Sequence, residues 1–235
     1  EFRTDTKRAT LEFGRTLRDW GELRAGAFTQ AEDGTTRVGT SATPDYVEHS
    51  DGILLSFRID TLDSPAFPRQ GWDLLTRFTD ARTSLGSDVD RRQSLIVGRT
   101  ALSFERNTLS PAVEVGWTSE GTVTPGSAYR LGGIGRLSGL HHDELLGEQY
   151  GLARLLYYRE LTRLDLGALS NRAYAGASIE TGNVYGPLDP VTSGSLRHSG
   201  SLFLGAQTIV GPAYLGLGFA DGGERLLYFL IGEHF

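Results

Sequence analysis

A glycine-rich stretch between Tyr129 and Tyr158 comes closest to a ligand-binding pattern in this chain. Glycine-rich loops can hold a phosphate group with their backbone N–H groups, but such loops join a strand to a helix and end in Lys followed by Ser or Thr. This stretch has neither feature. We therefore predict an irregular loop without a phosphate site, whose core is Arg136, Leu137, Ser138, Gly139 and Leu140.

Two further kinds of chemistry can be tested against the sequence. His141 and His142 are adjacent, so in an extended chain their side chains point to opposite sides, and the spacings typical of zinc ligands are missing. A serine hydrolase often carries its nucleophile in a Gly-x-Ser-x-Gly turn, which this chain lacks. We expect no catalytic residue, no metal ion and no cofactor.

The composition excludes several classes of protein. Of the 235 residues 39% are hydrophobic and 31 are glycine, which indicates a folded chain with unusually many glycines. The net charge is -6, and no basic stripe is present that could neutralise the phosphates of a nucleic acid. The chain has no cysteine, so disulfides and thiolate metal sites are excluded.

Alternation of apolar with polar residues dominates the sequence and indicates strands that each have one apolar face. Leu11 and Phe13, for example, flank Glu12. The same period recurs in segments 22–30, 50–61, 72–82, 93–105, 107–118, 173–185, 201–209, 213–220 and 225–235. No run of about 18 apolar residues is present, which excludes a membrane-spanning helix. A strand of a transmembrane barrel needs only about 10 residues.

We predict about eleven strands and no helix, joined alternately by short turns and longer polar loops, as in outer-membrane barrels. Charged residues recur on the polar strand faces, at Arg24, Arg58, Arg77, Arg99, Glu105, Glu114 and Arg154. A wide, water-filled lumen accepts such side chains, whereas the core of a small soluble barrel does not. The sequence therefore predicts an all-β, antiparallel transmembrane β-barrel.

A second motif lies in the turn that begins at Asp60. Two prolines, one of them Pro68, remove backbone donors, and Gly71 can adopt a positive φ. The carboxylates of Asp60 and Asp63 can accept hydrogen bonds from loose backbone amides. These residue types predict an ordered turn.

Four segments resemble the outer-membrane superfamily that contains BamA, TamA and FhaC. They are the turn from Asp60 through Phe67 to Gly71, the loop 131–140, the strand 178–185 with the sequence Ser-Ile-Glu-Thr-Gly-Asn-Val-Tyr, and the end of the chain, 223–235. Three features are most similar to barrels fused to patatin-like phospholipases, the type Vd autotransporters: the Leu-Ser-Gly loop core, the Glu-Thr-Gly-Asn-Val strand and the hairpin 211–216. The resemblance covers essentially the whole chain.

The resemblance implies a loop that folds into the lumen and is held there by an acid of the inner wall. Glu180, on the same strand as Gly182, takes the place of that acid, whereas Ser138 stands where the superfamily has an arginine. Two replacements for this arginine stay open: Arg136, or a hydrogen bond between the Ser138 hydroxyl and Glu180. A charge-assisted hydrogen bond of this kind contributes roughly 1.5–3 kcal/mol.

The resemblance also implies a barrel of about sixteen strands, of which the sequence predicts about six before the loop and about five after it. The first strands would come from an absent segment or from another chain, as in a homodimer, or would be unnecessary because the sheet closes on a partner. The final aromatic residue, Phe235, would be read by the barrel-assembly machinery. Candidates for the aromatic girdles at the membrane surface are Tyr157, Trp72, Trp117 and Tyr214.

For function, the resemblance implies a barrel in the outer membrane of a Gram-negative bacterium that anchors, and helps to export, an amino-terminal passenger polypeptide. Its partners would be outer-membrane lipid, the passenger and the barrel-assembly machinery, and not nucleic acid. Any phospholipase activity would reside upstream of Glu1. A passive porin-like channel or structural anchor is the alternative, and a soluble β-sandwich is a third.

Overall fold

The computed structural model describes residues 2–36, 45–166, 169–186, 195–208 and 211–232, and nearly all of them lie in strands. The strands are β1 (Phe2–Leu17), β2 (Gly21–Thr36), β3 (Tyr46–Asp60), β4 (Gln70–Ala81), β5 (Arg91–Phe104), β6 (Asn107–Glu120), β7 (Tyr129–Leu131), β8 (Leu145–Gly147), β9 (Gln149–Leu166), β10 (Leu169–Tyr185), β11 (Arg197–Thr208), β12 (Gly211–Ala220) and β13 (Arg225–Ile231). A short 3-10 turn, η1 (Thr83–Leu85), precedes β5. Within these ranges no helix is long and apolar enough to cross a membrane.

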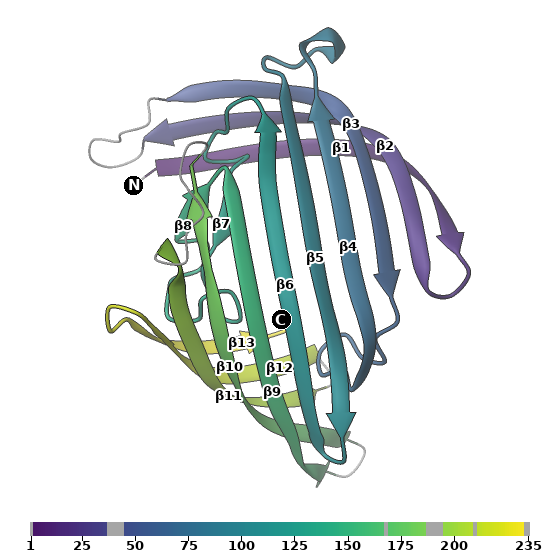
Figure 1. Cartoon of the computed structure of the whole chain (residues 1–235), viewed down its shortest axis with the longest axis vertical. Coiled ribbons are helices and arrows are strands. Elements are labelled where there is room, and N and C mark those ends of the chain that lie inside the picture. Colours follow the sequence, from purple (N-terminus) through teal and green to yellow (C-terminus); the bar gives the residue numbers. More distant parts are fainter. Residues whose placement is uncertain (1, 37–44, 167–168, 187–194, 209–210, 233–235) are drawn as a thin grey trace.

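Eleven strands form one antiparallel sheet in the order β1-β2-β3-β4-β5-β6-β9-β10-β11-β12-β13. Neighbours in the chain are neighbours in the sheet, except that β6 pairs with β9 across the 121–148 loop, which carries the small pair β7-β8. The sheet curls, so that β11 to β13 lie behind the front strands in Figure 1. The predicted all-β antiparallel fold is confirmed, with six strands before the loop and five after it.

The two edges of this sheet are β1 and β13, and neither pairs with a further strand among the described residues. The sheet is therefore an open trough in the part of the chain that the structure describes. In a bilayer both edges would need a partner, because hydrocarbon offers no hydrogen bonds to backbone groups. Phe235, the expected assembly signal, lies outside the described residues.

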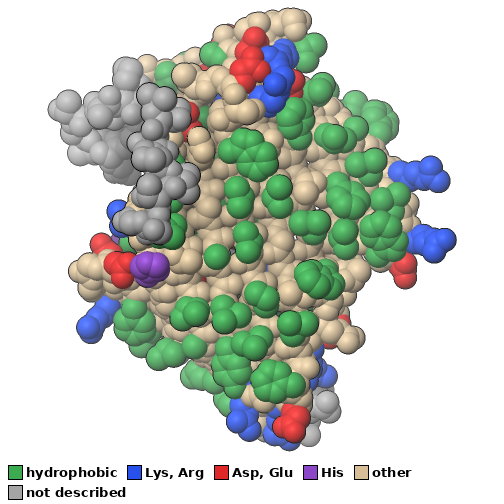
Figure 2. Space-filling model, viewed as in Figure 1, with side chains coloured by type: hydrophobic (Ala, Val, Ile, Leu, Met, Phe, Trp, Pro, Cys, Tyr) green, Lys and Arg blue, Asp and Glu red, His purple; other side chains and the backbone are tan. Residues whose placement is uncertain are grey.

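The outer face of the sheet is apolar. Its exposed hydrophobic side chains include Ile53, Leu55, Ile96, Val113, Val115, Leu155, Leu202, Leu204, Leu215, Leu217, Leu227 and Phe229. Figure 2 shows hydrophobic side chains spread over the middle of this face, with charged side chains toward its margins. Such a belt bordered by charge is what a lipid-facing barrel wall presents.

The inner face carries charged side chains that pair with one another across strands. Asp73 on β4 accepts hydrogen bonds from Arg58 on β3 and from Arg99 on β5, both at 3.3 Å. Glu105 departs from the prediction of an inward charge. It lies in the turn between β5 and β6 with φ of 53°, because the hairpin reverses direction there.

Candidate functional site

The core of the glycine-rich loop, residues 136–140, lies directly against the inner face of β12. Leu137 and Ser138 are 0% exposed. A Cβ atom on Gly218 of β12 would lie 1.8 Å from the Ser138 carbonyl oxygen, and one on Gly139 would lie 2.2 Å from the backbone nitrogen of Ala220. The loop and the wall thus touch backbone to backbone, which glycine permits and a larger residue would prevent.

Glu180 on β10 accepts hydrogen bonds from this core. Its carboxylate is 3% exposed and accepts from the Ser138 backbone N–H at 2.6 Å and from the Ser138 hydroxyl at 2.6 Å. The Ser178 hydroxyl donates to the same carboxylate at 2.5 Å. The Ser138 hydroxyl also accepts from the Gly135 backbone N–H at 2.8 Å, so it joins the loop to itself as well as to the wall. Three donors satisfy Glu180 without an arginine of the loop.

Two arginines still hold the loop, but from other positions. Arg154 on β9 is the cross-strand partner of Glu180, and its buried guanidinium donates to the Gly135 carbonyl oxygen at 3.1 Å. Arg136 points elsewhere and pairs with Glu114 on β6, with Nη2 3.0 Å from Oε2. Of the two replacements that the sequence left open, the structure contains the hydrogen bond from Ser138 to Glu180.

Side chains that the sequence did not single out complete this contact. The Tyr228 hydroxyl on β13 lies 2.7 Å from the Ser138 carbonyl oxygen and 2.8 Å from that of Leu140, so it can donate to either. The Ser199 hydroxyl on β11 accepts from the Gly139 backbone N–H at 3.0 Å. The sequence does contain a signal for this contact: the residues of β10 to β12 that face inward here are small, namely Ser178, Ser199, Ser201, Gly216 and Gly218.

Gly182 lies two residues beyond Glu180 on the same inner face. It is opposite Leu152 of β9, and a Cβ there would lie 2.5 Å from the Gly151 carbonyl oxygen. The small residue therefore keeps β9 and β10 closely paired at this point. It does not contact the loop core through a side chain.

The first part of the loop is fixed by β7. The Tyr129 hydroxyl donates to the Ser94 carbonyl oxygen on β5 at 2.7 Å. Burial raises the pKa of Tyr129 to about 12, because the charged phenolate would lose its hydration. Leu131 packs in one cluster with Leu137 and Leu140 of the core. Hydrogen bonds and apolar contacts together hold the loop inside the trough.

The turn between β3 and β4 has the chemistry that its residues predict. The Asp63 carboxylate accepts from the backbone N–H groups of Arg69 at 2.7 Å and Gln70 at 3.3 Å, and Asp60 accepts from that of Leu62 at 3.3 Å. Gly71 has φ of 108°, and a Cβ there would lie 2.1 Å from the Thr61 carbonyl oxygen. These contacts fold the segment back over the inner face.

The turn places Phe67 inside the trough, at the rim opposite the 121–148 loop. Phe67 is 3% exposed; its ring stacks on Tyr174 with centroids 4.1 Å apart, and contacts Tyr158 edge-on at 5.8 Å. The Tyr158 hydroxyl donates to the Pro68 carbonyl oxygen. The Tyr214 hydroxyl donates to the Ala66 carbonyl oxygen at 3.4 Å. We call the contact of Phe67 with Tyr158, Tyr174 and Tyr214 the aromatic clamp. We call the hydrogen bonds from Ser138 to Glu180 the loop latch.

Tyr214 belongs to this clamp, which corrects an expectation. The sequence made Tyr214 a candidate for the aromatic girdle at the membrane surface, but it is 1% exposed and its ring centroid lies 5.2 Å from that of Phe67. Leu215 and Leu217 take the outer face of β12, so the period of two turns Tyr214 inward. Trp72 and Tyr157 do lie on the outer face.

Comparison with known proteins bears on the fold. No family model matches the chain, and no curated protein matches it. Among solved structures, it is similar to the crystal structure of BamA from Haemophilus ducreyi lacking POTRA domains 1-3, with a TM-score of 0.77 and 13% sequence identity. The chain shares its fold with the part of that structure that it matches. The match covers 97% of this chain and 54% of that chain, so the chain spans about half the length of the structure it matches.

Proposed function

We propose that the chain forms the wall of an outer-membrane translocator in a Gram-negative bacterium, which anchors and helps to export an attached passenger. The observation that carries this proposal is the doubly occupied lumen: the loop latch and the aromatic clamp hold two inserts against one wall from opposite rims. The edges of β1 and β13 support it: they pair with no further strand among the described residues, and such edges accept further strands.

A passive porin is the alternative, and the inserts count against it. Porins keep a water-filled channel through the barrel. Here the inner cavity bordered by Arg58, Arg99 and Arg154 has a volume of about 410 Å³. The same cavity is bordered by Leu62 and Pro65 of the turn, so the turn closes part of its wall.

The test uses the full-length protein with its natural passenger in outer membranes. Wild type should show low conductance, and deletion of residues 132–145 should raise it. Glu180→Ala should leave passenger in the periplasm, because the loop loses its acceptor. A large, steady conductance that the deletion leaves unchanged would establish the porin instead. Solubility without detergent, together with no heat-modifiable mobility on gels, would reject the membrane location.

Finer features belong to the same proposal. A patatin-like passenger, recognition of Phe235 by the barrel-assembly machinery, and closure of the sheet by further strands or a second copy are supported only by the sequence resemblance. Each can be read from the full-length protein: the identity of the passenger from its upstream sequence, and closure from cross-links between cysteines introduced into β1 and β13.

A further inference from the structure

A hollow in the outer face of the wall, on the side opposite the inserts, has no role in the proposed function. It lies over β6, β9 and β10 and has a volume of about 520 Å³. Gly151 forms its floor, since a Cβ there would meet no atom within 4 Å. Its border is mostly carbon, from Val113, Val115, Trp117, Ala153 and Leu196.

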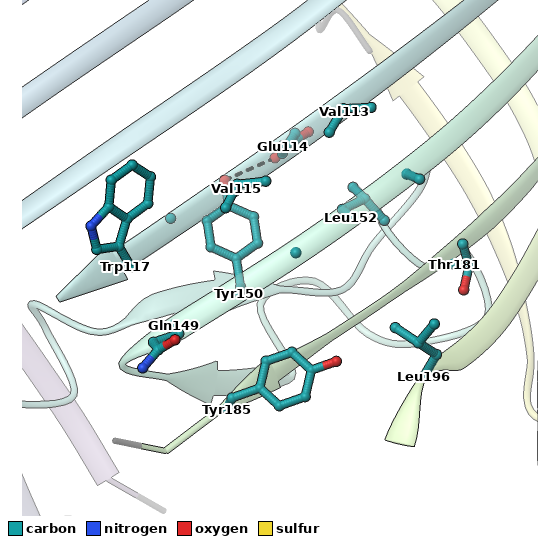
Figure 3. A pocket seen from close by; sticks show the side chains of 13 residues that line it. Val113, Glu114, Val115, Trp117, Gln149, Tyr150, Leu152, Thr181, Tyr185 and Leu196 are labelled. Atoms are coloured by element: carbon teal, nitrogen blue, oxygen red, sulfur yellow. Dashed lines mark hydrogen bonds between the residues drawn. The ribbon is translucent and has the colours of Figure 1, made fainter. Parts of the chain in front are cut away.

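The hollow follows the strand direction and has two different ends. Trp117, Gln149 and Tyr185 form one row across the three strands, beside the long loops. Val113, Ala153 and Thr181 form a second row, four positions deeper in the sheet, which is about 13 Å along a strand. Figure 3 shows Trp117, Gln149 and Tyr185 toward one side and Val113 and Thr181 toward the other. The shape suits an extended chain that lies along the strands.

Two hydroxyl groups at the hollow have no hydrogen-bond partner among the described residues. Tyr185 is 5% exposed, and both its hydroxyl and that of Thr181 are buried without a hydrogen bond to any described residue. A buried hydroxyl that makes no hydrogen bond is costly. Both hydroxyl oxygens are buried, so bulk water does not relieve that cost. An oxygen atom of a ligand in the hollow can supply the missing acceptor, because Thr181 and Tyr185 both border the hollow.

We propose that the hollow binds one acyl chain of a membrane lipid, whose ester or amide oxygen accepts a hydrogen bond from Tyr185. This inference rests on the proposed membrane location. The hollow is continuous with lipid-facing side chains, since Val113 is 55% exposed and Leu155 is 39% exposed. Its polar end carries Trp117 and Tyr185, the residue types that lie at the level of lipid headgroups. The acyl chain then runs inward over Gly151.

The test counts lipid retained by the full-length protein after transfer from phosphatidylethanolamine nanodiscs into mild detergent, by native mass spectrometry. Wild type should keep one lipid more than Gly151→Leu, whose side chain fills the floor. Tyr185→Phe should lower the affinity of that lipid several-fold. Leu55→Phe, on the outer face of β3 and away from the hollow, should retain lipid as wild type does.

Heat-modifiable mobility establishes that each variant is folded, and Tyr185→Phe decides alone if Gly151→Leu does not fold. Equal lipid retention by wild type and Tyr185→Phe, or by wild type and a folded Gly151→Leu, would overturn the acyl site. Unchanged lipid with a lost dimer in Gly151→Leu would overturn it in favour of a protein interface. A wild-type protein that stays soluble without detergent would reject the proposed membrane location, and this outcome is distinct from the loss of the acyl site alone.

Discussion

The loop latch and the aromatic clamp hold two inserts against the same wall by different forces. In the latch, directional hydrogen bonds to the charged carboxylate of Glu180 fix the position of Ser138 against the wall. In the clamp, Phe67 buries a whole ring among tyrosines. A hydrogen bond contributes little net free energy but is costly to leave unmade in a buried site. Burial of an aromatic ring contributes a large free energy, most of it from the non-directional hydrophobic effect. Loss of one hydrogen-bonding partner can therefore release the loop, whereas the turn is released only when the whole Phe67 ring leaves its buried position.

This difference assigns separate tasks to the inserts within the proposed translocator. The loop has the contact that is easier to release, so we expect it to yield first when a passenger or a partner competes for Glu180. The turn has the stronger contact and should keep β9, β10 and β12 at fixed distances. Four predictions test the contrast, and they are ordered by the size of the expected effect.

Phe67→Ala should lower the free energy of unfolding by about 3–5 kcal/mol, because it leaves a cavity among Tyr158, Tyr174 and Tyr214. Thermal unfolding in detergent measures the change. Phe104→Ala, on the exposed outer face at the same rim, is the matched control and should cost far less. A loss in Phe67→Ala no larger than that of the control would show that the clamp does not hold the turn.

Glu180→Ala should weaken loop docking by about 3 kcal/mol, since the Ser138 N–H and the hydroxyls of Ser138 and Ser178 lose their buried acceptor. Hydrogen exchange should rise in residues 131–147 and stay low in residues 61–69. Glu224→Ala, at an exposed carboxylate, should leave both segments protected. Equal loss of protection in the loop and the turn would mean that the two inserts are one cooperative unit.

Ser138→Ala should weaken docking by about 1–2 kcal/mol, because it removes the hydroxyl bonds to Glu180 and Gly135 but keeps the backbone N–H bond. The same exchange experiment should show an effect between those of wild type and Glu180→Ala. An effect as large as that of Glu180→Ala would show that the Ser138 hydroxyl alone holds the loop and that the backbone N–H bond adds nothing.

High pH should loosen the loop to a smaller extent. The pKa of Tyr129 is raised from 10.0 to about 12, so the docked loop favours the neutral phenol. Its contribution is complete below pH 10 and is lost as the pH rises through about 12. Protease cleavage of the loop should increase over this range in wild type. Tyr129→Phe should remove that particular pH dependence, and an unchanged pH profile in this variant would contradict the assignment.

The sequence by itself determined the strands, their number and the chemistry of the turn. A period of two makes Leu215, Leu217 and Phe219 share one face, whatever the rest of the chain does. Asp63 and Gly71 act within a few residues of their own backbone partners, so their roles are local as well. These features depend on neighbours in the chain, which the sequence lists directly.

Only the tertiary structure decided the contacts between distant strands. The partner of Glu180 is 42 residues away, and Tyr214 reaches Ala66 over 148 residues. Periodicity groups residues by face but does not say which face is inside or which rows meet. The curl of the sheet and the register of its strands brought Tyr214 to Ala66 and Arg154 to the loop. They also brought aromatic side chains from four strands, β9 to β12, around Phe67. These depend on how the whole sheet folds, and no local pattern encodes them.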